Sequence, residues 1–192
     1  MIVPADYHKL NSLPDAPEGC ISYGKQTDNA SCIISIYPIS SEAAMDFNDK
    51  EALIDGIHRT LAENQAIIEV ENGKLLSGRP FIYSVIKTYH GKEDGVVYTL
   101  VMDFPVPSTI VRVQAFFQEN GITGLRDATV FARLQQEDIA LSEDKWFFDP
   151  YETDSQASYK MNLSEKAEYD ELFPEHPLSQ CRLLIKHFKE NF

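Results

Sequence analysis

Three apolar stretches with strand-like patterns dominate the middle of the chain. They span residues 79–90, 96–104 and 110–117, and each is rich in β-branched and aromatic side chains, a composition typical of strands. Glycines at both ends of 91–95 fit a hairpin loop. The prolines of 104–108 remove backbone donors, so we expect the ladder to be interrupted there. The pattern as a whole predicts a β-meander.

The chain before the meander predicts a hairpin, a helix and a short strand. Apolar and polar residues alternate on both sides of a polar turn, which indicates a hairpin over residues 19–37. Asn48 or Asp49 is placed to cap a helix whose apolar residues recur every four positions. Residues 66–71 are then expected to form a strand that ends in a turn at the Asn-Gly pair 72–73.

The meander strands need cover on both sides. The first two are largely apolar on both faces, and a helix over 123–137 is predicted to follow the third. The acidic, turn-rich segment 137–156 contains Trp146, Phe147 and Phe148. Because leaving these rings in water would forfeit about 1.5–3 kcal/mol apiece, we predict that they pack back onto the domain and help to cover the second face of the sheet.

Two further helices are predicted after this segment, a short one over 164–172 and a longer one beyond it. The longer helix carries an apolar stripe that includes Leu178, Cys181, Ile185 and Phe188. Such a stripe can dock on its own chain or on a partner. These four side chains are therefore the candidate partner-binding residues.

Length and charge narrow the class of protein. The chain has 192 residues, which suits an α+β core domain, residues 1–140, with an aromatic linker and helical tail, residues 141–192, packed on it. Its 30 acidic and 17 basic residues give a net charge of −13, which opposes binding to nucleic acids and anionic membranes. Neither a signal peptide nor a membrane-spanning segment is expected. Three widely spaced cysteines without a Cys-x-x-Cys pair favour a reducing, cytoplasmic location.

The best candidate for a ligand site is the stretch 121–126. Gly121 and Gly124 allow close backbone approach, Thr123 is the expected helix N-cap, and Arg126 near a helix N-terminus would attract a phosphate or carboxylate. The same residues fit an ordinary strand exit and helix start equally well. No Walker or dinucleotide-binding pattern is present.

Catalytic residues, metals and cofactors are not expected. The five histidines show no His-x-x-x-His or His-x-His spacing, and no Gly-x-Ser-x-Gly elbow occurs. Paired carboxylates arise by chance in a chain with 30 acidic residues. Binding is therefore the more plausible role than catalysis.

The order of these elements resembles the Mog1/PsbP-like fold. The order is a hairpin over 21–37, a helix from Asp49, a short strand, the meander and a helix from Thr123, and it covers residues 19–137. The resemblance implies an α/β/α sandwich and a class of mostly non-catalytic proteins that bind another protein. Residues 162–179 also look like a tail found on uncharacterised bacterial proteins.

Two functional hypotheses follow. The first is a non-catalytic cytoplasmic binding or adaptor protein, monomeric or homodimeric, with an unidentified protein partner. The alternative is a small-molecule binder or enzyme that uses the 121–126 loop and Arg126 to hold an anionic ligand.

Overall fold

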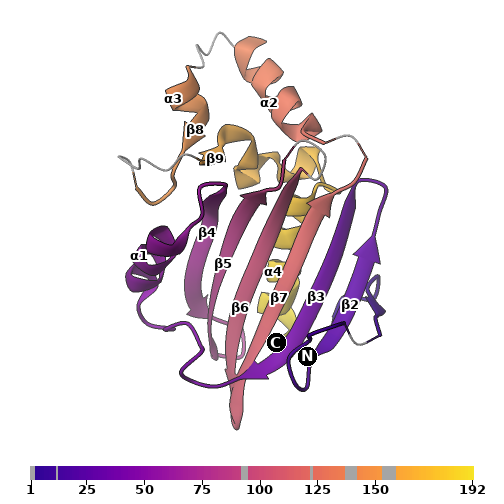
Figure 1. Cartoon of the computed structure of the whole chain (residues 1–192), viewed down its shortest axis with the longest axis vertical. Coiled ribbons are helices and arrows are strands. Elements are labelled where there is room, and N and C mark those ends of the chain that lie inside the picture. The colour runs from indigo at the N-terminus through magenta and orange to yellow at the C-terminus, as the bar shows by residue number, and fades with distance from the viewer. Residues whose placement is uncertain (1–2, 12, 92–94, 122, 137–141, 153–158) are drawn as a thin grey trace.

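A seven-stranded antiparallel sheet forms the body of the protein within the residues described by the computed structural model, which are 3–11, 13–91, 95–121, 123–136, 142–152 and 159–192. The strand order is β1-β2-β3-β7-β6-β5-β4 (Figure 1). The strands are β1 (His8–Lys9), β2 (Ile21–Gln26), β3 (Ala30–Ile39), β4 (Gln65–Lys74), β5 (Pro80–Tyr89), β6 (Val96–Val106) and β7 (Thr109–Glu119). The α+β fold class with a C-terminal helix is confirmed.

Helices and a small second sheet complete the chain. The α-helices are α1 (Lys50–Thr60), α2 (Leu125–Gln136), α3 (Glu143–Trp146) and α4 (Pro177–Asn191). The second sheet pairs β8 (Phe147–Phe148) with β9 (Met161–Asn162). Two 3-10 turns, η1 (Leu163–Glu165) and η2 (Ala167–Leu172), occupy the place of the predicted short helix. None of the helices that the structure describes is long and apolar enough to cross a membrane.

Two predicted breaks in the strands are wrong. The β6–β7 ladder continues through Pro105, which pairs with Ile110. On the other side of β6, pairing with β5 ends at Asp103. The missing N–H of Pro105 therefore costs no hydrogen bond to β5. The turn expected at 72–73 is absent too, because β4 runs on to Lys74. An added Cβ at Gly73 would lie 3.1 Å from the ring of Phe81, so this glycine permits a close side-chain approach.

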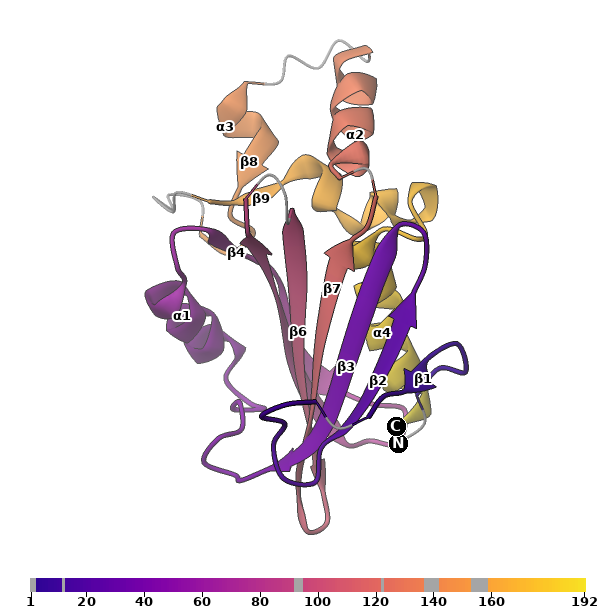
Figure 2. The ribbon, with the colours of Figure 1, turned by 45° about the vertical axis from the view of Figure 1, so that its right-hand side comes forward.

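The main hydrophobic core lies between the sheet and α4. Strands β6 and β7 contribute Leu100, Met102, Val113 and Phe117, which are all fully buried. Helix α4 runs along this face of the sheet, as the two views in Figures 1 and 2 show. Its buried residues belong to the same hydrophobic cluster as the strands, so the tail completes the core of the sheet.

The burial of α4 bears directly on the four candidate partner-binding residues. Leu178, Cys181, Ile185 and Phe188 are each at most 4% exposed and pack against the sheet of their own chain. A partner cannot reach them while α4 is docked. The apolar stripe is therefore a core element.

The second face of the sheet is covered mainly along its β4 edge. There α1 packs Ile54 onto Ile67 and Val70. The predicted covering aromatics divide between three places: Tyr151 packs in this cluster, Phe148 packs against the main core, and Trp146 packs against α2 in a separate cluster. On β3 and β7, the paired residues Ile33 and Phe116 remain 40% and 39% exposed.

Burial of the cysteines leads to a simple chemical prediction. Loss of solvent raises the pKa of the Cys32 thiol to about 12 and that of Cys181 well above its usual value, whereas Cys20 is only partly buried. We expect Ellman's reagent to modify Cys20 alone rapidly in the native protein, and all three cysteines after denaturation. Rapid modification of Cys32 or Cys181 under native conditions would contradict the burial of these residues.

Candidate functional site

A polar pocket of about 330 Å³ lies at the end of the sheet where β5, β6 and β7 meet α2 and the C-terminal segment. We call it the acidic pocket. Its lining residues are Lys87, Tyr89, Gly91, Gly95, Val96, Tyr98, Glu119, Thr123, Gly124, Asp127, Tyr159, Glu165 and His176. Strands, a helix start and the C-terminal segment therefore all contribute to it.

A buried ion pair forms one wall of the acidic pocket. Lys87 Nζ donates to Glu165 Oε2 over 2.8 Å, and both side chains are 2% exposed. Tyr98 Oη donates to the other oxygen of Glu165, also over 2.8 Å. Glu165 is held by a capping box in which Asn162 N donates to Glu165 Oε2 and Ser164 N to Asn162 Oδ1. The local sequence of the tail thus fixes a carboxylate against a strand lysine.

Two more carboxylates face the acidic pocket. Asp127, in the first turn of α2, accepts hydrogen bonds from Ser164 Oγ and Asn162 Nδ2. Burial raises the pKa of the Asp127 carboxyl, the hydrogen bond from Ser164 opposes this rise, and the charge of Glu165 adds to it. A cation bound in the pocket would therefore stabilise ionised Asp127.

Glu119 is the third carboxylate of the acidic pocket. It lies 3.3 Å from His176 Nε2 and accepts a hydrogen bond from Gly124 N over 3.1 Å. His176 is fixed in turn because its Nδ1 caps α4 by accepting from Leu178 N. The end of β7, the start of α2 and the start of α4 thus meet at this carboxylate.

Tyrosine rings supply the remaining walls. The rings of Tyr89 and Tyr159 lie 5.9 Å apart, and Lys87 Nζ lies 4.5 Å from the centre of the Tyr159 ring. Burial raises the pKa of the Tyr98 and Tyr159 phenols, so both are neutral at physiological pH. Neutral rings beside carboxylates suit a positively charged group.

The charges in the acidic pocket favour a cationic ligand. Among the described residues that line it, three carboxylates, Glu119, Asp127 and Glu165, face one ammonium group, Lys87, and one imidazole, His176. Even with His176 protonated, the formal net charge of these five groups is negative. An anion would meet more like charge than opposite charge here.

The structure separates the residues of the predicted 121–126 site. Thr123 and Gly124 line the acidic pocket. Gly121 does not line it, and its φ of 71° shows that it serves the exit from β7. Arg126 points elsewhere, into the segment that joins η1 to α4.

Arg126 has partners within the protein for its whole guanidinium group. Its side chain is 1% exposed. The guanidinium donates to the carbonyl oxygens of Ser164 and Lys166, to Ser179 Oγ and to Asp170 Oδ1, over 2.7–3.0 Å. An external anion would have to displace these protein partners.

A second groove of about 290 Å³ lies next to the acidic pocket and shares Glu119 and His176 with it. Its lining is more apolar and includes Leu125, Leu172 and Phe173. Leu125 and Leu172 are exposed. Its apolar surface lies beside the charged one, so a single bound segment could contact both.

One feature of the sequence points to this site. Phe81, Tyr83, Val85 and Lys87 alternate along β5, so they share one face. A lysine in such a row must find a buried partner or leave the core. Glu165 could not be named as that partner from sequence, since 78 positions separate the two.

Comparisons with known proteins identify structural neighbours only. No family model matches the chain, and no curated protein matches it. The structure of PA94 from Pseudomonas aeruginosa, a protein of unknown function, aligns over 71% of this chain and 96% of its own, with a TM-score of 0.40 and 9% identity. That of the Ran-binding protein Mog1p of Saccharomyces cerevisiae aligns over 68% and 76%, with a TM-score of 0.40 and 12% identity.

Similarity of this degree says nothing about what the present chain binds. The function proposed for this chain therefore depends on the acidic pocket.

Proposed function

We propose that this chain is a cytoplasmic, non-catalytic binding protein whose acidic pocket receives a lysine or arginine side chain of a partner protein. The observation that carries the proposal is the excess of carboxylates over cations among tyrosine rings in one pocket. A desolvated ammonium or guanidinium group would gain charge-assisted hydrogen bonds and cation–π contacts there.

The size of the pocket supports a single side chain as the occupant. A volume of about 330 Å³ lies at the small end of the range of about 300–1,000 Å³ for ligand pockets. The adjoining groove with Leu125, Leu172 and Phe173 would then contact apolar neighbours of the basic residue. A peptide segment satisfies both surfaces better than a free metabolite does.

The charge of the whole molecule supports a basic partner. A net charge of −13 attracts positively charged proteins and raises their association rates at low salt. The three free cysteines support a reducing compartment. The alternative of an anionic ligand at the 121–126 loop is not favoured, because the donors of Arg126 are bonded within the protein.

A matched pair of peptides tests this proposal. Acetyl-Gly-Arg-Gly-amide is titrated by calorimetry against the full chain, next to the same peptide with citrulline, which keeps the shape of arginine but carries no charge. We expect the arginine peptide to bind at least tenfold more tightly, about the effect of one charge-assisted hydrogen bond. Equal binding of the two peptides, or no binding of either, would refute the proposal.

A matched pair of variants locates the binding. Glu119→Gln removes a charge from the acidic pocket and should weaken the arginine peptide by about tenfold. Glu171→Gln removes an exposed charge of η2 that lines neither the acidic pocket nor the neighbouring groove, and it serves as the control. An equal loss in both variants would indicate general electrostatic attraction and would contradict a specific site.

A further inference from the structure

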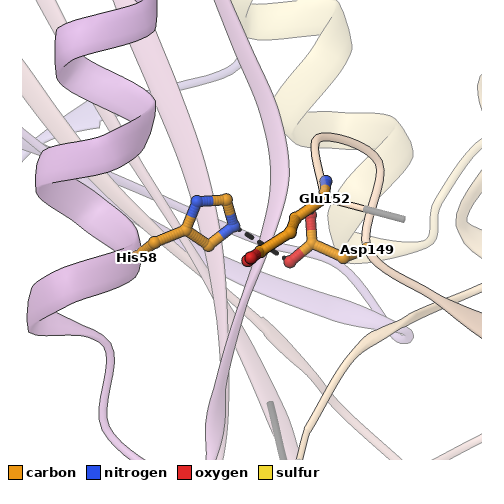
Figure 3. A group of neighbouring side chains, drawn as sticks. All are labelled: His58, Asp149 and Glu152. Carbon is orange, nitrogen blue, oxygen red and sulfur yellow. Dashed lines mark hydrogen bonds and ion pairs between the residues drawn. The ribbon is translucent and has the colours of Figure 1, made fainter. Parts of the chain in front are cut away.

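Three side chains that could bind a metal converge outside the acidic pocket (Figure 3). His58 lies on α1, and Asp149 and Glu152 lie in the turn after β8. One ligand atom from each lies within 4.8 Å of the other two. His58 Nε2 is 3.0 Å from Asp149 Oδ2. A helix and a distant loop thus present one imidazole and two carboxylates to a common point.

The loop side of this cluster is held by its own hydrogen bonds. Asp149 Oδ1 accepts from the backbone N–H groups of Tyr151 and Glu152 over 2.9 and 3.1 Å. These bonds leave Oδ2 to face His58, and the Asp149 side chain is only 6% exposed. Tyr151 Oη bonds to the backbone of Val70 on β4. The carboxylate is therefore positioned before any ion arrives.

The helix side is held by packing. Ile54 and Ile57 of α1 pack with residues of β4, in a cluster that also contains Tyr151. His58 follows directly on this helix. Both halves of the cluster are therefore anchored on β4, and their separation is set by the fold.

The charges of the cluster are unbalanced without a cation. Two carboxylates face one imidazole, so the formal charge is negative even if His58 is protonated. Within the part of the chain that the structure describes, the Glu152 carboxylate makes no hydrogen bond or ion pair. Like charges at this range repel unless a cation lies between them.

We propose that His58, Asp149 and Glu152 bind a divalent transition-metal ion of the Zn²⁺ class and thereby tie α1 to the turn 149–152. Zn²⁺ takes imidazole nitrogen and carboxylate oxygen at about 2.0–2.2 Å, which places ligand atoms about 3.4 Å apart in a tetrahedron. The spacing of 3.0 Å between His58 and Asp149 suits this. Glu152 is exposed and closes the site by a side-chain rotation. Three protein ligands leave one position for water.

Zinc titration of the metal-free full chain tests the site. We expect one Zn²⁺ per chain by calorimetry, a rise in the melting temperature with added ZnCl₂, and visible absorption bands when CoCl₂ replaces it. His58→Ala and Glu152→Gln should each weaken Zn²⁺ binding at least tenfold, because loss of even a group that only supports a ligand costs about 10–100-fold in metal affinity.

Two variants distinguish loss of a metal ligand from a general effect on the protein. Glu152→Gln removes a carboxylate without a partner among the described residues, so it keeps the test valid even if loss of the contact between His58 and Asp149 destabilises His58→Ala. His8→Ala removes an exposed histidine of β1 and should leave Zn²⁺ binding unchanged. Absence of Zn²⁺ binding, or binding unaffected by both cluster variants, would overturn the proposal.

Discussion

A chain that ends at His176 is expected to lose cooperative unfolding altogether. Deletion of 177–192 removes the buried side chains of α4, including Leu178, Leu184 and Phe188. Each buried side chain of this kind contributes about 1.5–3 kcal/mol, and together they rival the stability of a whole domain, about 5–15 kcal/mol. The exposed sheet face would also aggregate. Circular dichroism on heating, with binding of an apolar dye, measures both effects.

Two point variants of α4 serve as a graded control. Leu184→Ala should lower the free energy of unfolding by about 2–5 kcal/mol because it opens a cavity in the core. Leu183→Ala changes an exposed residue of the same helix and should have an effect within about 0.5 kcal/mol. A truncated chain that still melts cooperatively at the wild-type temperature would show that α4 is dispensable.

Arg126→Met is expected to lower the free energy of unfolding by about 3–5 kcal/mol, the usual cost of breaking a buried ion pair by removing one partner. Methionine fills much of the same volume, but it leaves the buried carbonyl oxygen of Ser164 and Ser179 Oγ without the guanidinium donor, and it leaves Asp170 with its contacts to Arg182 and Ser179. For a chain of this size the melting temperature should fall by about 10 °C. A thermal melt followed by circular dichroism measures it.

Arg59→Met provides the comparison for Arg126. Arg59 is an exposed residue of α1, so its loss should cost about 0.5 kcal/mol or less. If the two variants melt at the same temperature, Arg126 does not hold the C-terminal segment in place. An anion-binding role would then have to be reconsidered.

The strands were predictable because a half-buried strand repeats every two residues and the pattern is local. The α4 stripe was predictable for the corresponding reason, with a period of 3.6 residues. The partner of that stripe was not, since an apolar face looks the same whether a sheet or another protein covers it. The turn expected at 72–73 failed because Gly73 serves a contact with Phe81, and such a long-range contact leaves no local pattern.

The candidate site was only partly predictable. Thr123 and Gly124, predicted as part of an anion site, line the acidic pocket, and they could be singled out because a helix start is a local feature. The partners of Arg126 could not be predicted, because position in the first turn does not tell which side of the helix faces the tail. Lys87 could be recognised because it is the one charged residue in a row of apolar residues on β5. The remaining carboxylates come from separate segments and meet only through the fold.

The metal cluster was missed for the same reason. His58 and Asp149 are 91 positions apart, so no ligand spacing of the His-x-x-x-His kind could reveal them. Only the docking of the turn 149–152 beside α1 brings the two together.

The most direct test of the proposed binding site is a nuclear magnetic resonance titration with acetyl-Gly-Arg-Gly-amide. Backbone amides of Gly91, Gly95 and Gly124 line the acidic pocket and resonate in a well-separated region of the nitrogen–proton spectrum. We expect these three signals, with Thr123, to shift saturably with the arginine peptide and to stay in place with its citrulline counterpart. Shifts confined to another surface, or identical shifts with both peptides, would contradict it.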